Sequence, residues 1–248
     1  MKRLYEKSEL AFALVWIGIF VTLLTAGDGI SMLLGIEKVV TLPLTIAMTV
    51  VLHVFICKNG LKEKFGLCGV AGSWKNYLFF IPLVLLVSVN LWWGVTMNYS
   101  VMETVFYVLA MLCVGYIEEI IFRGFLFTAM AANDVKSAII VSSVTFGAGH
   151  VVNLLNGSPI FDTLLQICYA AAVGLLFTVI FYKGKSLWPC ILTHSLVNAV
   201  SAFMNQSKVT PLWNILASVF MCVVSLLYAW YIWKKAAGGR GQCVQSAQ

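Results

Sequence analysis

The stretch TVFYVLAMLCVGYIEEIIFRGFLFTAMAA, residues 104–132, carries three charged side chains within an otherwise apolar run. They are Glu118, Glu119 and Arg123. A helix of about 20 apolar residues crosses a bilayer, and an ionisable side chain at its centre costs a few kcal/mol or more, roughly. The charges therefore indicate a functional site inside a membrane helix, with a buried ion pair that locks two helices as the competing interpretation.

The whole chain has the composition of an integral membrane protein. Of its 248 residues, 61% are hydrophobic and only 10% are charged, whereas soluble domains carry about 25% charged residues. Apolar runs long enough to span a bilayer predict an all-α, polytopic membrane protein with about eight transmembrane helices. The predicted spans are 10–26, 39–57, 77–97, 104–132, 137–155, 163–182, 187–205 and 212–233.

The positions of lysine and arginine predict how the chain is oriented. If both termini are cytoplasmic, only Lys38 and Lys208 fall in outside segments, and Arg123 belongs to the charged motif. This bias follows the positive-inside rule, so we interpret the net charge of +6 as topological and expect no nucleic-acid partner. We expect one membrane domain at 1–236, with its motif core at 104–205, and a disordered polar tail at 237–248.

Helical spacing assigns different positions to the two glutamates. Glu119 and Arg123 are four residues apart, so they share a helix face and can form an ion pair. Glu118 lies about 100° around the helix from Glu119. We therefore expect Glu119 to be the partner of Arg123 and Glu118 to face a cavity.

Two further segments place polar side chains in predicted spans. In FGAGH, residues 146–150, Phe146 and His150 share a face, and the small residues between them allow another helix to approach closely. In HSLVN, residues 194–198, His194 and Asn198 share a face. Either histidine alone would be interpreted as a hydrogen-bonded core residue, and His53 is interpreted so. Together with the glutamates, these segments indicate a polar cavity.

This set of side chains suits hydrolysis. A glutamate can take a proton from water, while histidine and asparagine can donate hydrogen bonds to a developing oxyanion. Alternatively, Glu118, His150 and His194 could hold a zinc ion with one position open for water. The seven cysteines form no CxxC pair and suggest neither a disulfide framework nor a zinc cage.

The three segments resemble the motifs of a known family. EEIIFR (118–123) is similar to the EExxxR motif of the CPBP intramembrane proteases, which include the Rce1-type CaaX prenyl endopeptidases and the bacterial Abi proteins. FGAGH matches the FxxxH motif of that family, and HSLVN matches its HxxxN motif. The motifs occur in the family's order, on hydrophobic segments.

The resemblance implies a role for each motif residue. Glu118 would activate the attacking water, Glu119 would support it, and Arg123 would fix the glutamates by ion pairing. In the second motif, His150 would orient the water or the base, and Phe146 would shape the cavity wall. In the third, His194 would stabilise the oxyanion or bind a metal, and Asn198 would stabilise the oxyanion. The family is usually described as metalloproteases, so zinc is a possible cofactor, although a glutamate-driven mechanism without metal is also argued for it.

We therefore expect an intramembrane endopeptidase. Its substrate would be a membrane-associated peptide or protein, either a CaaX-type tail or a signal or bacteriocin peptide. The short loops favour a multi-pass protein of a bacterial plasma membrane. A proton- or ion-coupled transporter is the first alternative, because such proteins also place glutamate, histidine and arginine in the membrane. A non-catalytic membrane scaffold with the same fold is the second.

Overall fold

The described part of the chain is built from helices. The computed structural model describes residues 1–236, and the predicted tail at 237–248 lies outside the described residues. Within this range, seven helical segments are long and apolar enough to cross a membrane. This confirms the predicted all-α, polytopic membrane fold.

The α-helices follow one another with short 3-10 or π segments between some of them. The α-helices are α1 (Lys2–Lys7), α2 (Glu9–Leu34), α3 (Thr41–Lys58), α4 (Ile81–Ser88), α5 (Val101–Glu119), α6 (Thr128–Ala131), α7 (Val135–Gly149), α8 (Ile160–Gly184), α9 (Trp188–Val200) and α10 (Pro211–Lys235). The shorter segments are 3-10 helices at Trp74–Phe80, Val89–Leu91, His150–Leu154, Ser201–Phe203 and Gln206–Lys208, and a π-helix at Ile120–Phe127.

Polar residues at the helix termini explain where several helices begin. The Ser8 side chain accepts a hydrogen bond from the Ala11 backbone at the start of α2. At the start of α5, Ser100 and Glu103 form a reciprocal capping box. Such caps satisfy backbone N–H groups that have no partner inside the helix. Gly35 ends α2 in the left-handed conformation, with φ of 69°, which glycine adopts without steric cost.

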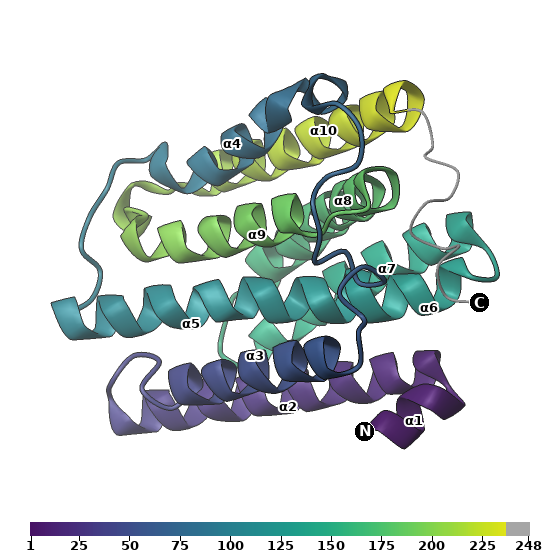
Figure 1. Cartoon of the computed structure of the whole chain (residues 1–248). Coiled ribbons are helices and arrows are strands. Elements are labelled where there is room, and N and C mark those ends of the chain that lie inside the picture. Colours follow the sequence, from purple (N-terminus) through teal and green to yellow (C-terminus); the bar gives the residue numbers. More distant parts are fainter. Residues whose placement is uncertain (237–248) are drawn as a thin grey trace.

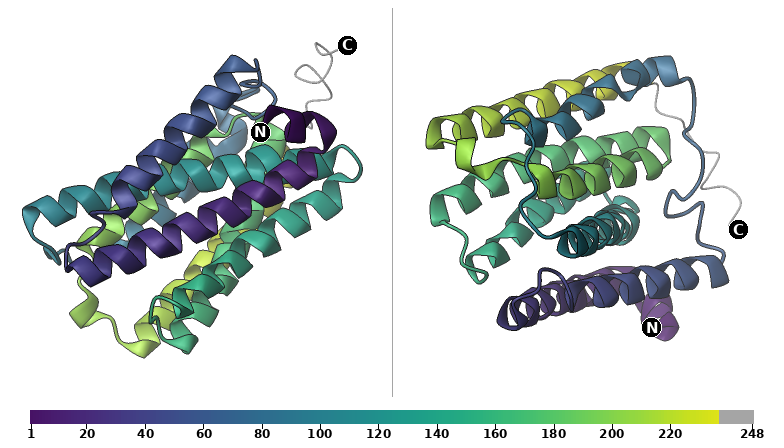
Figure 2. Two further views of the ribbon diagram at one scale, coloured as in Figure 1. Left: turned by 90° about the horizontal axis from the view of Figure 1, so that it is seen from below. Right: turned by 90° about the vertical axis from the view of Figure 1, so that its left-hand side faces the viewer.

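The helices lie in layers (Figures 1 and 2). Helices α2 and α3 form one outer layer, α4 and α10 form the other, and α5, α8 and α9 lie between them. The α2–α3 hairpin and the connection from α9 to α10 lie at the end of the bundle opposite the N-terminus. Lys38 and Lys208 belong to these two connections, so these two lysines lie at the end of the bundle opposite the N-terminus.

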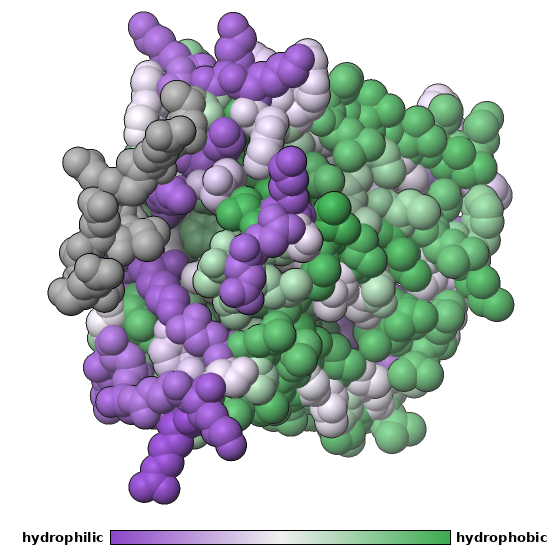
Figure 3. Space-filling view, turned by 90° about the vertical axis from the view of Figure 1, so that its right-hand side faces the viewer, coloured by the Kyte–Doolittle hydropathy of each residue, from purple (hydrophilic) through white to green (hydrophobic). Residues whose placement is uncertain are grey.

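The outer surface is largely apolar. Exposed leucine and valine side chains line the helices, including Val84 on α4 and Leu212 on α10, which are 65% and 63% exposed. Figure 3 shows hydrophilic residues gathered along one side of one face, beside a broad hydrophobic surface. An apolar patch of this size on a protein indicates contact with lipid or with another protein.

Two predicted spans differ from the structure. The span predicted at 187–205 forms only the 13-residue helix α9 and a 3-10 turn, which is shorter than the roughly 20 residues that a bilayer crossing needs. The span predicted at 77–97 is present as the candidate span Trp74–Leu91, but its backbone is kinked: Leu78, Phe79 and Phe80 have positive φ, and α4 starts only at Ile81. Hydropathy alone contains no information on these backbone changes.

Small residues let the motif-bearing helices approach closely. A Cβ atom on Gly115 of α5 would lie 2.5 Å from Ser195 Oγ of α9. A Cβ atom on Gly147 of α7 would lie 2.8 Å from Ala171 Cβ of α8. The predicted close approach at FGAGH is therefore confirmed at Gly147, and Gly115 provides a second one beside the glutamates.

Candidate active site

The charged motif lies where α5 passes into the π-helix. Glu118 and Glu119 are the last two residues of α5, and Arg123 is in the middle of the π-helix. Arg123 Nη1 donates a hydrogen bond of 3.0 Å to Glu119 Oε1, and neither side chain is exposed. The predicted Glu119–Arg123 pair is confirmed. The π-helix itself was not predicted; such segments are rare and occur frequently at functional sites.

His194 of α9 connects the two glutamates. Its Nδ1 lies 2.8 Å from Glu119 Oε1, and its Nε2 lies 3.2 Å from Glu118 Oε2. Arg123 and His194 therefore meet at the same Glu119 oxygen, and Glu118 ends a chain of four charged or titratable groups. The split between a paired Glu119 and a cavity-facing Glu118 agrees with the helical spacing, whereas the bridging position of His194 comes from helix packing.

Phe146 of α7 packs against this chain. Its ring centroid lies 5.4 Å from that of His194 and 5.4 Å from that of His150, edge to face in both cases. The Arg123 guanidinium carbon lies 4.2 Å from the Phe146 ring centroid, which is close enough for a cation–π interaction. Phe146 thus holds the side chains of the three motifs together and forms part of the cavity wall, as predicted.

A cavity of about 410 Å³ joins the predicted site residues. Its lining includes Glu118, Phe146, His150, His194 and Asn198. Glu119 and Arg123 do not line it, in agreement with their positions behind His194. The three motifs therefore meet at one internal space.

His150 and Asn198 offer free polar atoms to this cavity. Their side chains make no hydrogen bond or ion pair with another residue in the range 1–236. His150 is the first residue of the 3-10 segment that follows α7, and Asn198 lies one turn after His194 on α9. Both side chains are therefore available to a molecule that enters the cavity.

The cavity extends away from the motifs toward the α2–α3 hairpin. At that end its lining includes Asp28 and Lys38, which form an ion pair of 2.8 Å. Lys38 Nζ also lies 5.6 Å from the Tyr107 ring centroid, and Tyr107 Oη lies 2.9 Å from Ser201 Oγ. These four residues surround the outer end of the cavity.

Sequence reasoning missed these four residues and several other polar side chains in the lining. Among them, Asn153 Nδ2 donates a 2.8 Å hydrogen bond to Gln166 Oε1, and Asn90 Nδ2 donates one of 2.8 Å to the Val197 carbonyl. The available signal was a polar residue in an apolar run, as at Tyr107 and Gln166. A polar residue in an apolar run does not show which residue it will contact. The sequence therefore could not predict that these side chains line one cavity.

The predicted zinc ligands do not form a ligand cluster in this arrangement. In the described range, no three histidine, cysteine, aspartate or glutamate side chains are placed to hold a metal ion. Both ring nitrogens of His194 face carboxylates, and the His150 side chain forms no hydrogen bond or ion pair with another residue in the range 1–236. The set of Glu118, His150 and His194 therefore does not fit zinc as placed.

Comparison with known proteins gives an independent result for the same region. Residues 100–200 match the model of a family described as Rce1-like, type II CAAX prenyl endopeptidase. This segment is Rce1-like. The match includes all three motifs and confirms the predicted family resemblance for this part of the chain. Comparison with curated proteins and with solved structures finds no match.

The Rce1-like segment does not contain the whole cavity. It runs from the capping box at the start of α5 to the end of α9 and so includes Glu118, His150, His194 and Asn198. Asp28 and Lys38, at the outer end of the cavity, precede the matched residues. Helices outside the match therefore complete the space in front of the motif residues.

Proposed function

We propose that this protein is an intramembrane endopeptidase in which Glu118 activates water to hydrolyse a peptide bond. The observation that carries the proposal is the chain Arg123–Glu119–His194–Glu118, which ends at the cavity. A buried ion pair alone would need only Glu119 and Arg123. The second carboxylate, placed at the cavity and linked to a histidine, gives the chain an acid–base group that can meet a substrate.

The arrangement around His194 organises the proton transfers. Glu119, balanced by Arg123, accepts a hydrogen bond from His194 Nδ1–H and so holds the orientation of the ring. The opposite nitrogen, Nε2, faces Glu118 Oε2. When His194 carries both ring protons, it donates to the Glu118 carboxylate and holds it in place beside the cavity.

The reaction then proceeds in two proton transfers. Glu118 takes a proton from water as the water oxygen forms a bond to the carbonyl carbon of the scissile peptide. The carbonyl oxygen becomes an oxyanion. Glu118 next returns the proton to the leaving nitrogen as the carbon–nitrogen bond breaks, which produces a carboxyl group and an amine and restores the enzyme.

His150 and Asn198 are the proposed oxyanion donors. Both line the cavity, and neither side chain forms a hydrogen bond with another residue in the described part of the chain. Donors directed at the position of developing charge contribute roughly 10²–10³-fold each to the rate. His194 was expected to share this role, but its two nitrogens are already directed at Glu119 and Glu118.

The shape of the cavity favours a short extended peptide segment as the substrate. A space of about 410 Å³ that runs from Glu118 to Asp28 and Lys38 is longer than a single side chain needs. The apolar helix surfaces around it favour a substrate that is itself anchored in the membrane. CaaX-type tails and signal or bacteriocin peptides meet these conditions.

The test is cleavage of a library of membrane-anchored peptides by the purified protein. The wild type is compared with Glu118→Gln, which keeps the size of the side chain but cannot act as a base, and with Glu6→Gln on the exposed helix α1 as a control. We expect wild type and Glu6→Gln to cleave a shared subset and Glu118→Gln to lose at least about 10²-fold in rate. Equal cleavage by all three, or none by the wild type, would contradict the proposal, and proton flux in liposomes would then favour the transporter.

A further inference from the structure

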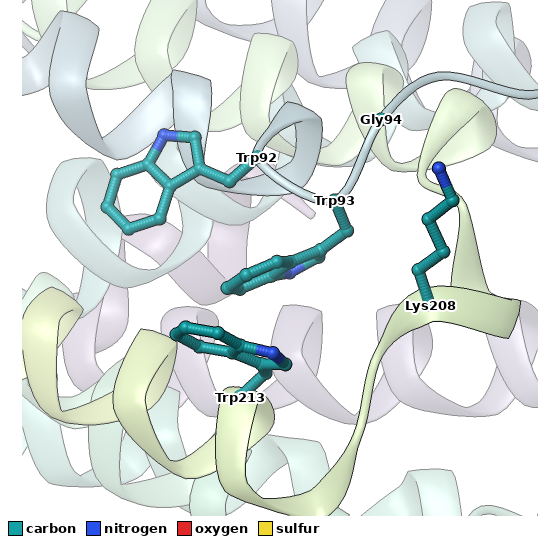
Figure 4. A pocket seen from close by; sticks show the side chains of 5 residues that line it. All are labelled: Trp92, Trp93, Gly94, Lys208 and Trp213. Carbon is teal, nitrogen blue, oxygen red and sulfur yellow. The ribbon is translucent and has the colours of Figure 1, made fainter.

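A second pocket lies at the end of the bundle opposite the N-terminus, away from the motif residues. It has a volume of about 400 Å³ and is lined by Trp92, Trp93, Gly94, Lys208 and Trp213 (Figure 4). The ring centroids of Trp93 and Trp213 are 5.0 Å apart, and those of Trp92 and Trp93 are 6.4 Å apart. Three indoles and one ammonium group therefore surround one space.

Backbone hydrogen bonds hold the two walls of this pocket together. Val95 and Met204 form an antiparallel bridge, and the Asn205 N–H donates to the Gly94 carbonyl at 3.2 Å. The Asn98 side-chain amide donates to the Met204 carbonyl at 2.9 Å. Gly94 itself has φ of 89°, a conformation that favours glycine. These hydrogen bonds thus fix the walls of the pocket, which come from two connections far apart in the chain.

Lys208 is a cation without an ion-pair partner in the described range. Lys38, the other lysine at this end, is bound to Asp28 at 2.8 Å and lies 3.7 Å from Glu37. Lys208 instead lines the pocket, with its Nζ extended toward Gly94 and 3.8 Å from where a Cβ atom on Gly94 would lie. A free ammonium group beside a preformed pocket attracts an anion.

The indole N–H groups are further hydrogen-bond donors that can bind an anion. Trp92 Nε1 donates to Ser88 Oγ at 3.0 Å, whereas Trp93 and Trp213 Nε1 have no acceptor among residues 1–236. Figure 4 shows the nitrogen-bearing parts of both rings on the side nearer Lys208. No carboxylate lines the pocket. Three free donors and no acceptor side chain define a site for an oxyanion.

The surroundings of the pocket indicate which kind of molecule carries that anion. Val84 on α4 and Leu212 and Leu216 on α10 are 65%, 63% and 45% exposed, and α4 and α10 pack against each other. In a membrane these side chains face acyl chains, and tryptophan rings lie at the level of the lipid headgroups. An interfacial anchoring role would use the indole rings alone and would not require the lysine or the bonded walls.

We propose that this pocket binds the phosphate group of a membrane phospholipid whose acyl chains lie along α4 and α10. Lys208 Nζ and the N–H groups of Trp93 and Trp213 contact the phosphate oxygens. The site is independent of peptide cleavage, although Met204, which forms part of its bonded wall, also lines the catalytic cavity.

The experiment compares three probes on the purified, delipidated protein in a non-ionic detergent. Phosphatidylglycerol carries both phosphate and acyl chains, sn-glycerol 3-phosphate carries the phosphate alone, and diacylglycerol carries the acyl chains alone. Binding is measured by native mass spectrometry of the adducts and by quenching of tryptophan fluorescence. We expect saturable binding of phosphatidylglycerol at one site and no saturable binding of the other two probes.

Two variants and one control locate the site. Lys208→Gln removes a charge-assisted contact and should weaken phosphatidylglycerol binding roughly tenfold or more. Trp93→Phe keeps an aromatic ring, although a smaller one, but removes the N–H and should weaken binding by about fivefold. The control is Lys234→Gln, because Lys234 also lies over a tryptophan, 4.3 Å from the Trp230 ring centroid, but near the C-terminal end of α10. Its affinity should equal that of the wild type.

Several results would overturn the proposal. Equal binding of diacylglycerol would show that the phosphate is not recognised, and saturable binding of glycerol 3-phosphate would identify a free phosphate ester as the ligand. Unchanged affinity in both Lys208→Gln and Trp93→Phe would place the lipid elsewhere. Lys208 is exposed, so its variant should fold, and Trp93→Phe provides the second, uncharged change.

Discussion

Gly115→Ala is the sharpest test of how helix packing builds the site. The added Cβ atom would lie 2.5 Å from Ser195 Oγ and 2.6 Å from the Ser195 backbone nitrogen and Cα. Carbon atoms pack at about 3.5 Å or more, so α5 and α9 must separate by roughly 0.9 Å at this point. Backbone atoms cannot rotate away, which leaves separation of the helices as the available relief.

The separation would break the link between His194 and Glu118. His194 precedes Ser195 on α9, so the 3.2 Å distance from its Nε2 to Glu118 Oε2 would rise to about 4 Å, beyond hydrogen-bond range. Overpacking of this kind destabilises a protein by about 1–3 kcal/mol. A displacement of about 1 Å at a reacting group lowers a rate by about 10²-fold.

The assay measures thermal unfolding in detergent and cleavage of the best peptide from the library. The matched control is Gly124→Ala, five residues after Glu119, where the nearest atom to an added Cβ is Phe65 Cβ at 3.6 Å. This control should keep its activity and gain up to about 1 kcal/mol from helix propensity. If Gly115→Ala matched the wild type in both measurements, the close approach of α5 and α9 would not position the site.

Three further predictions concern the charged chain and the cavity. Arg123→Met leaves the buried Glu119 carboxylate without its cation and should lower the free energy of unfolding by about 3–5 kcal/mol; adding Glu119→Gln should recover part of the loss in a denaturation series. Asn198→Ala should reduce the cleavage rate by roughly 10²-fold with an unchanged unfolding midpoint, since its side chain bonds to no other described residue; a lower midpoint with a normal rate would assign it a structural role. Cleavage should persist in a strong zinc chelator, because the His194 nitrogens face carboxylates; loss of activity that added zinc restores would show a metal mechanism.

Much of the site could be predicted from local spacing. The i, i+4 relation paired Glu119 with Arg123 and turned Glu118 away from it, and the structure agrees. Such predictions succeed because neighbouring residues on a helix have a fixed geometry, whatever surrounds the helix. Hydropathy likewise identified the membrane segments, apart from the short α9, although it did not predict the kink before α4.

The rest depended on contacts between distant parts of the chain. His194 lies 75 residues from Glu119 and meets it only because α9 packs on α5 at Gly115. The outer end of the cavity depends on Asp28 and Lys38, which belong to helices outside the motif segments. Neither contact can be predicted from the spacing of residues along a single helix.

The sequence by itself therefore determined that the chain spans a membrane and which side chains bring charge into it, because hydropathy and helical periodicity are local properties. Only the tertiary structure decided that His194 bridges the two glutamates, that Asp28 and Lys38 complete the outer end of the cavity, and that Lys208 lines one pocket with Trp93 and Trp213. The physical reason is that these arrangements arise from close packing of helices and bonded loops, where a single added carbon atom changes which side chains meet.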